Sequence, residues 1–261
     1  MVLKRQPDAS VSSLVNNDIN YWNRVAIDYD IFIFRGDILR EQLLNKVILE
    51  LLGDIHTRKI LDAGCGQGYF SKILNYIGAE IIGIDASEKI IEIARKNNPS
   101  IEFLVHDLRQ VLPFRNAEFD GILCNMVLMD FDPIDNAISE FSRLIKTKST
   151  LVFSILHPAF SIGKLRKNIW QKITNQVPHR EIYDYKKEIR KNWKIAGLNQ
   201  STIIYHRPIE YYVSLLKKYH FYIRDVREPV LDKEFVKDKN NFLKLCSKIP
   251  PFLIIEAIKI T

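Results

Sequence analysis

Short apolar segments alternate with amphipathic segments along the middle of the chain, and this alternation limits the possible folds more than any other feature. The apolar segments are rich in β-branched residues and predict strands at 59–63, 80–84, 101–105, 119–124 and 150–156. Between them, helices are expected over 69–77 and 87–97, and a third with Asp132 as N-cap and Pro133 in its first position. Buried strands that alternate with helices predict a parallel sheet covered on both faces.

The flanking regions extend this pattern. A helix is expected over 37–52, between Asp37 as N-cap and Gly53, and another over 208–218. Strands at 221–227 and 252–260 bring the sheet to seven strands, the last of them antiparallel. The first thirty residues are polar, with scattered aromatics and no clear periodicity. The predicted fold is an α/β, three-layer Rossmann-like sandwich with a mainly parallel seven-strand sheet and an inserted cap.

Composition agrees with a folded protein of this size. The 261 residues are 47% hydrophobic and 26% charged, which supports a sizeable core and excludes global disorder. No apolar run approaches the ~18 residues of a membrane span, and residues 1–10 lack the apolar stretch of a signal peptide. Cys65, Cys124 and Cys246 are too few and too scattered for a disulfide framework or a zinc site. We therefore expect a reduced, cytoplasmic protein without a metal site.

The net charge of +7 is concentrated in residues 159–205. This segment holds ten basic and three acidic residues, whereas the rest of the chain holds 28 of each kind. Aromatic side chains lie between these charges: Phe160, Trp170, Tyr183, Tyr185, Trp193 and Tyr205. The expected divisions are an N-terminal lid with the first helix (1–58), a core (59–158), a basic and aromatic insertion (159–205) and the C-terminal part of the core sheet (206–261).

The strongest chemical signal is the run Asp62-Ala63-Gly64-Cys65-Gly66-Gln67-Gly68, between the first predicted strand and its helix. Glycines there allow a ligand close to the backbone, and the helix N-terminus offers free N–H groups to a negative group. The alternative is a tight turn without a ligand. A dinucleotide loop would need a third glycine where Tyr69 or Ser71 stands, so this loop does not suit a pyrophosphate.

An acid ends the second strand, where it could accept both hydroxyls of a ribose. This residue is Asp85, and its structural alternative is to cap the helix that Ser87 begins. Together with the glycine loop, it makes a nucleoside ligand at this edge of the sheet the better interpretation.

With these residues, the chain resembles the class I S-adenosylmethionine-dependent methyltransferases, specifically the small ones of the methyltransferase-11 type. The resemblance is good over 59–156 and weaker to the C-terminus. It implies that the first loop holds the methionine end of the cofactor and that the acid at the end of the second strand binds its ribose. Asp107 and Leu108 would then lie by the adenine, and the end of the fourth strand by the methionyl part. The implied cofactor-binding residues are Asp62, Gly64, Cys65, Gly66, Gly68, Asp85, Ala86, Asp107, Leu108 and Asn125.

Two histidines are the candidate catalytic residues. His157 closes the fifth strand, at the carboxyl edge where ligands bind in such sheets, and His206 stands where the chain re-enters the core. A base is needed only if the methyl acceptor must lose a proton. A hydrogen-bonded structural role is the alternative for both. If His157 is catalytic, His157→Ala retains cofactor affinity and loses most turnover.

The regions around the core suggest how ligands enter. Tyr21, Trp22 and Tyr29 could form an aromatic lid over the cofactor or simply pack on the core. The insertion could be a solvated, partly helical cap over the acceptor, a surface that recognises an anionic or carrier-bound molecule, or a nucleic-acid surface.

Nucleic acid is disfavoured, because the fourth strand ends in Asn125-Met126-Val127-Leu128 and lacks the Asn/Asp-Pro-Pro-aromatic motif of enzymes that methylate nucleic-acid amino groups. The resemblance implies methyl transfer from S-adenosylmethionine to an oxygen, nitrogen or carbon of a small-molecule acceptor. The alternatives are an RNA or other nucleic-acid methyltransferase, and a cofactor-binding protein without catalysis. The sequence leaves the oligomeric state open.

Overall fold

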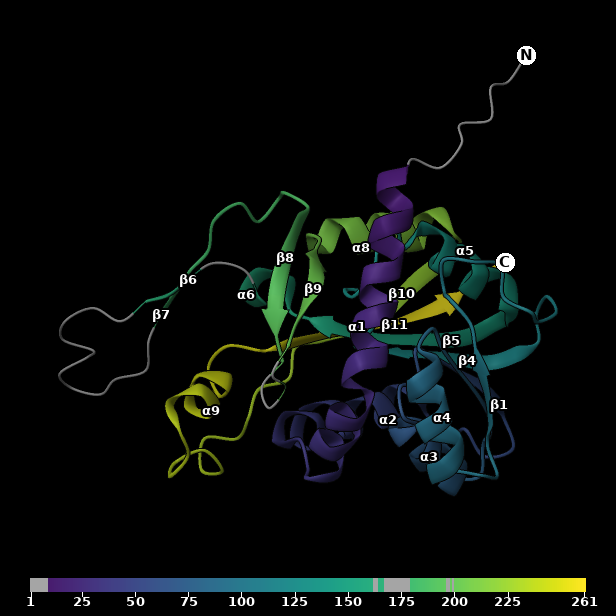
Figure 1. Ribbon diagram of the computed structural model, residues 1–261, viewed down its shortest axis with the longest axis horizontal. Coiled ribbons are helices and arrows are strands. Elements are labelled where there is room, and N and C mark those ends of the chain that lie inside the picture. The colour runs from purple at the N-terminus through teal and green to yellow at the C-terminus, as the bar shows by residue number, and fades with distance from the viewer. Residues whose placement is uncertain (1–8, 162–163, 167–178, 196–197, 199) are drawn as a thin grey trace, which may run out of the picture.

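A seven-stranded sheet forms the centre of the molecule in the computed structural model, which describes residues 9–161, 164–166, 179–195, 198 and 200–261 (Figure 1). The strand order is β10-β11-β5-β4-β1-β2-β3. Along the chain these strands are β1 Lys59–Ala63, β2 Glu80–Asp85, β3 Glu102–Val105, β4 Phe119–Asn125, β5 Ile145–Leu156, β10 Phe221–Arg227 and β11 Phe252–Lys259. The last strand, β11, is antiparallel to both neighbours, and the other pairs are parallel, which confirms the predicted sheet.

Helices cover both faces of the sheet and bury alternate residues of each strand. In β5, Leu151 and Phe153 join the core beneath α5 (Asp135–Leu144) and α8 (Ile209–Lys218), whereas Val152 joins the core on the other face. Full burial of one such side chain contributes about 1.5–3 kcal/mol. The second face is covered by the π-helical turn η1 (Arg40–Asn45), α2 (Lys46–Leu52), α3 (Tyr69–Tyr76) and α4 (Glu88–Asn97).

The N-terminal region forms a long helix that we did not predict, α1 (Ala9–Phe34). It lies against α4 and touches β9 (Ser201–His206). One side of it buries Tyr21 and Val25 against Leu198, but its other side exposes Ile27 and Phe34. Because apolar residues occupy both sides, the sequence shows no amphipathic period there.

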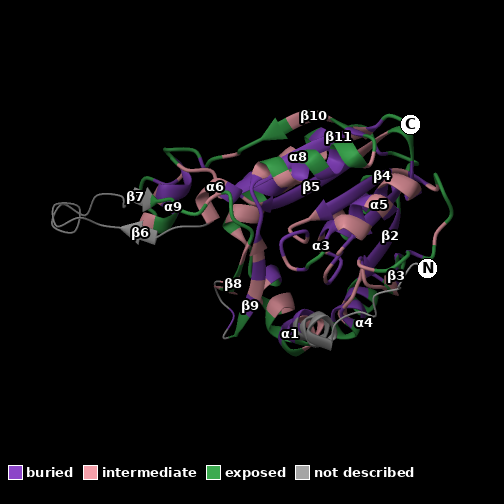
Figure 2. Cartoon of the chain, turned by 90° about the horizontal axis from the view of Figure 1, so that it is seen from above, coloured by how far each residue is buried: buried purple, intermediate pink, exposed green. Residues whose placement is uncertain are grey.

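Short strands, also unexpected, make up much of the insertion. After α6 (Pro158–Ser161), β6 (Lys164–Arg166) pairs with β7 (His179–Glu181), and β8 (Ile189–Lys194) pairs with β9. Figure 1 shows β6 and β7 at one end of the molecule, away from the seven-stranded sheet, and Figure 2 shows β8 and β9 beside α1. A further helix, α9 (Asn241–Cys246), precedes β11. Lys167, Trp170 and Lys172 lie outside the described residues.

The start of α5 differs from the prediction. The helix begins at Asp135, not after Asp132, because the Asp132 carboxylate instead accepts a hydrogen bond from Arg207 Nη2 at 2.7 Å. The other predicted caps of this kind are confirmed: Asp37 accepts from the Leu39 N–H at 3.1 Å, and Gly53 ends α2 with a positive φ of 66°. None of the helices in the described part of the chain has the length and apolar character to cross a membrane.

Candidate functional site

The glycine loop joins β1 to α3 at the carboxyl edge of the sheet, and its glycines have different roles. Gly64 has a φ of +78°, and a Cβ on it would lie 2.3 Å from Val127 Cγ2. A Cβ on Gly68 would lie 2.9 Å from Phe103 Cζ, so both glycines allow tight packing. At Gly66 a Cβ would meet nothing nearer than Tyr29, at 3.7 Å. Gly66 therefore lies at the open side of the loop, where a ligand can reach the backbone.

The carboxyl groups of Asp62, which is buried, and of Asp85, which is partly buried, hold this loop. The Asp62 carboxylate accepts a hydrogen bond from Ser71 Oγ at 2.6 Å, and burial, with Asp85 nearby, raises its pKa to about 6. Asp85 accepts from the Gly66 N–H at 3.1 Å and from the Ser87 N–H at 2.9 Å, and burial raises its pKa as well. Asp85 thus supports the turn before α4 and also lies beside the loop, as both interpretations of this residue expected.

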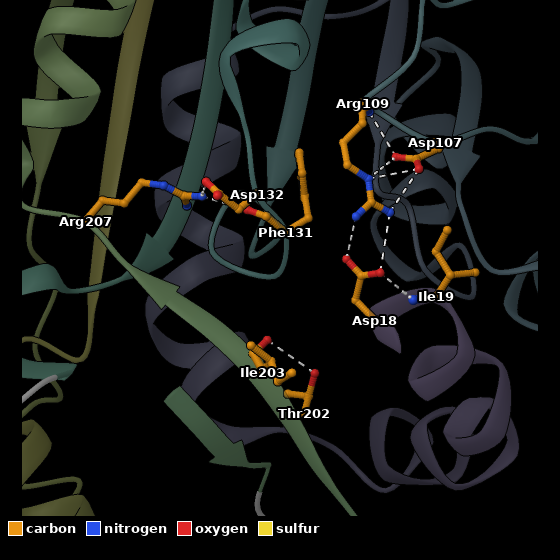
Figure 3. Close-up of polar contacts among 9 residues, drawn as sticks. All are labelled: Asp18, Ile19, Asp107, Arg109, Phe131, Asp132, Thr202, Ile203 and Arg207. Carbon is orange, nitrogen blue, oxygen red and sulfur yellow. Dashed lines mark hydrogen bonds and ion pairs between the residues drawn. The ribbon is translucent and has the colours of Figure 1, made fainter. Parts of the chain in front are cut away.

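A second acid-rich cluster lies after β3, around Arg109 (Figure 3). Arg109 Nε donates to both carboxylate oxygens of Asp107 at 2.9 Å, and Arg109 Nη1 donates to Asp18 of α1 at 2.8 Å. The pair with Asp18 is nearly buried, with 11% and 10% of the two side chains exposed. Arg109 therefore ties α1 to the core, a contact that sequence patterns did not indicate because the partners are distant in sequence.

The loop after β4 forms the opposite wall. Met126, with a positive φ of 62°, donates its N–H to Ser154 O and Ser154 Oγ at 3.0 Å, and Ser154 Oγ donates to Asn125 Oδ1 at 2.5 Å. A left-handed backbone at a non-glycine residue is strained and often marks a functional site. Further along this loop, Asp130 and Phe131 also line the wall.

These elements surround one cavity. Of the predicted cofactor residues, all but Gly68 line it: Asp62, Gly64, Cys65, Gly66, Asp85, Ala86, Asp107, Leu108 and Asn125. Of the three aromatic residues expected either to form a lid or to pack on the core, Trp22 and Tyr29 line the cavity, with ring centroids 5.3 Å apart, whereas Tyr21 packs against Val25 and Leu198. The lid itself stays a prediction. Lining residues that we did not predict include Asp18, Ile19, Arg40, His106, Arg109, Asp130 and Phe131.

Neither candidate histidine lines this cavity. His157 Nδ1 accepts the Ala159 N–H at 3.1 Å, so Nε2 carries the proton and donates to Glu228 at 2.5 Å. His206 Nε2 donates to Tyr185 O at 2.9 Å, and burial lowers the pKa of its ring. Both rings have protein partners, and these contacts favour structural roles. A catalytic role for either histidine stays a prediction.

The side chains that line the cavity fit the implied cofactor. S-adenosylmethionine presents ribose hydroxyls, a flat base and a positive sulfonium. The cavity offers the Asp85 carboxyl for hydroxyls, the apolar walls of Leu108 and Phe131 for a flat ring, and the Trp22 and Tyr29 rings for a cation. Within the described residues, no group of three or more histidines, cysteines and acids is placed to hold a metal ion.

Comparisons with known proteins agree with this geometry. The family described as "Methyltransferase domain" matches residues 61–153. A malonyl-[acyl-carrier protein] O-methyltransferase of Hamiltonella defensa is 30% identical over 134 residues, 51% of this chain and 50% of that protein. An uncharacterized protein of Haemophilus influenzae is 28% identical over 85% of this chain and 89% of its own. The chain spans about half the length of that named methyltransferase and of others like it.

The fold has a solved counterpart of nearly the same extent. An S-adenosylmethionine-dependent methyltransferase of Mesorhizobium loti superposes with a TM-score of 0.69 at 21% identity, over 82% of this chain and 96% of its own. The fold predicted from the resemblance is therefore confirmed, and the family match over residues 61–153 agrees with the kind of protein that the resemblance named. S-adenosylmethionine is the cofactor that the resemblance implies, and the superposed methyltransferase is named for it.

Proposed function

We propose that the chain transfers the methyl group of S-adenosylmethionine to a small-molecule acceptor, because residues 61–153 match the methyltransferase-domain family and the fold superposes on a methyltransferase that uses this cofactor. The observation that carries the proposal is the single cavity at the carboxyl edge of the sheet. Residues that follow four successive strands, β1 to β4, line it together, and α1 lines it from outside the sheet. A cofactor that contacts the residues after all four strands, and those of α1, would be held in one orientation.

The bound cofactor supplies an activated methyl group. The chain's own contribution is to position the reactants and to exclude water, since orientation alone can provide a large share of the rate. In this proposal Asp85 binds the ribose, the glycine loop holds the methionyl end, and Asp107 with Leu108 lies by the base. Helix α1, which supplies Asp18, Ile19, Trp22 and Tyr29 to the lining, covers the cofactor.

The acceptor could be an acyl group on a carrier protein or a free small molecule. The relative from Hamiltonella defensa is named for an acyl group on a carrier protein, and a basic insertion is compatible with such an acidic partner. Free small molecules with an oxygen, nitrogen or carbon nucleophile are the other kind, and we favour them because the cavity itself is lined mainly by acids and apolar groups. A nucleic-acid substrate, or cofactor binding without catalysis, remains the alternative function.

Calorimetric titration with S-adenosylmethionine and with S-adenosylhomocysteine tests the first step. We expect both to bind, and Asp85→Asn to weaken both by about tenfold or more, because a hydrogen bond to a charged group contributes about 1.5–3 kcal/mol. The matched control is Asp120→Asn near the amino end of β4, where the carboxylate pairs with Lys146 at 2.6 Å. Absence of binding by the unaltered chain would reject the proposal.

The acceptor is then identified by incubating the protein and methyl-labelled cofactor with small-metabolite extracts, with purified acyl-carrier protein and with RNA. Label in the low-molecular-mass fraction supports the proposal. Label in RNA, together with a mobility shift that weakens steeply above about 50 mM salt, would support the nucleic-acid alternative. Cofactor binding without label in any fraction would support the inactive alternative.

A further inference from the structure

Asp130 differs from the other acids of the cavity, whose carboxyl groups all have hydrogen-bond partners in the described part of the chain. It lines the cavity, yet within the described residues no hydrogen bond or ion pair reaches its side chain. Asp62 and Asp85 accept hydrogen bonds from their own loops, and Asp107 pairs with Arg109. The Asp130 side chain is only partly buried and lines the cavity, so a ligand bound there could supply the partner that the protein does not.

The loop that carries Asp130 is held firmly in place. Arg207, whose side chain is 1% exposed, donates to Leu128 O at 2.9 Å and to Phe131 O at 2.8 Å (Figure 3 shows the second partner). The Tyr205 N–H donates to Met129 O at 2.7 Å. Carbonyl groups on both sides of Asp130 are thus fixed by Tyr205, the last residue of the insertion, and by Arg207, so the backbone that carries the Asp130 side chain is held in place.

The electrostatic surroundings of Asp130 come from several elements. The titratable groups that interact with it are Asp18, Tyr21, Asp85, Cys124 and Tyr212. Burial, with Asp18 and Asp85 nearby, raises the pKa of the Asp130 carboxyl well above its usual range. A positive charge bound in the same cavity would favour the ionised carboxylate. Arg109 does not serve this purpose, because it is already paired with Asp18 and Asp107.

We propose that Asp130 accepts the proton of the methyl acceptor, and that the acceptor is therefore a hydroxyl, phenol or amine and not a carboxylate. This proposal rests on the proposed function. The acceptor's lone pair forms the new bond to the methyl carbon, while the carbon–sulfur bond breaks and leaves its electron pair on sulfur. The hydrogen of the acceptor passes to the Asp130 carboxylate. An anionic acceptor would instead be repelled by Asp130 and would have no proton to give.

The test compares Asp130→Asn with the unaltered chain, and with Asp135→Asn as the matched control. Asp135 begins α5 and pairs at the surface with Lys218 at 2.7 Å. Because the Asp130 carboxyl makes no stabilising contact, Asp130→Asn should unfold at or above the normal temperature. It should bind S-adenosylhomocysteine within about twofold of normal, and it should transfer label into the metabolite extract about 100-fold or more slowly. The control should match the unaltered chain in all three.

The labelled product provides an independent readout. A methyl group on an ether oxygen or on nitrogen survives mild alkali, whereas a methyl ester releases labelled methanol. Stable label supports the proposal. Alkali-labile label, normal transfer by Asp130→Asn, or a more than tenfold loss of S-adenosylhomocysteine affinity in that variant would overturn it, the last by assigning the carboxyl to the cofactor. If the unaltered chain binds the cofactor but labels nothing, the proposed function fails and this inference fails with it.

Discussion

The two sides of the cavity are held by contacts that differ greatly in sequence separation. On the side of the glycine loop, the partners are near in sequence: Ser71 and Asp62 are nine residues apart, and Gly66 and Asp85 are 19 apart. On the side of the loop after β4, Arg207 reaches Leu128 across 79 residues, and Arg109 reaches Asp18 across 91. The first side can form with its own strand and helix, whereas the second needs the whole sheet, the insertion and α1 to be in place.

Of the substitutions that test this difference, removal of the Arg207 side chain should have the largest effect on the free energy of unfolding. Arg207→Ala leaves the Leu128 and Phe131 carbonyls without their donor and opens a cavity under the loop. We expect it to lower the free energy of unfolding by about 4 kcal/mol. Arg207→Lys should lose nearly as much, since an ammonium group cannot reproduce the fork of hydrogen bonds. Chemical denaturation measures both.

The control for this experiment is Arg227→Ala, which removes an exposed ion pair with Asp225 at 2.8 Å. We expect no measurable change in its unfolding midpoint. If Arg207→Ala were equally harmless, the loop that carries Asp130 would not depend on the distant arginine, and the contrast between the two sides of the cavity would be lost.

On the glycine-loop side, Asp62→Asn should stabilise the protein at neutral pH. The folded pKa of about 6 lies above the usual 3.8, so the folded chain holds its proton to higher pH than the unfolded chain does. Ionisation of Asp62 therefore costs the folded state about 3 kcal/mol at pH 7, and this cost disappears as the pH falls through 6 towards 4. Asparagine removes the charge and can still accept from Ser71.

Denaturation at a series of pH values checks this. The gain from Asp62→Asn should be greatest near pH 7 and should vanish near pH 4, while cofactor affinity falls. A gain that does not depend on pH would mean that the Asp62 carboxyl is not the group under strain. The expected trade of stability against binding is typical of ligand sites.

The difference in sequence separation between the two sides of the cavity explains which features could be predicted from the sequence. The strands and the glycine loop follow from local patterns, so β1 to β4 were predicted correctly, and all but one of the predicted cofactor residues line the same cavity. That they bind the cofactor stays a prediction. Gly68 was assigned to the cofactor, but it lies outside the cavity lining and packs against Phe103. The spacing of the glycines cannot distinguish a ligand contact from a close packing contact.

The other half of the cavity could not be predicted, because no local pattern encodes it. Asp132 looked like an N-cap, yet its carboxylate pairs with Arg207, 75 residues away. Helix α1 has apolar residues on both sides, so its periodicity was hidden, and Asp130 stands in an apolar run that reads as core. The short strands β6 to β9 in the insertion are held by pairing between segments, which the sequence alone does not indicate.

Asp18→Asn should have the smallest effect on stability. It should nevertheless distinguish the two sides of the cavity, because only one of them depends on this contact. Burial raises the pKa of the Asp18 carboxyl even though Arg109 opposes this, so the pair gains little over its desolvation. Arg109 also keeps its contacts with Asp107. Because Arg109 is not left without an ionic partner, we expect only the loss of a hydrogen bond, about 1 kcal/mol in the free energy of unfolding.

The effect on α1 should be more visible than the effect on overall stability. Loss of the Asp18 carboxylate loosens the contact between α1 and the core, so the α1 amides should exchange hydrogen faster and cofactor affinity should fall severalfold, while the amides of β1 and β4 keep their protection. The matched control is Asp28→Asn, an exposed residue of the same helix. Equal exchange in the two variants would show that α1 is held by its packing on α4, and that the Arg109 ion pair has no part in closing the cavity.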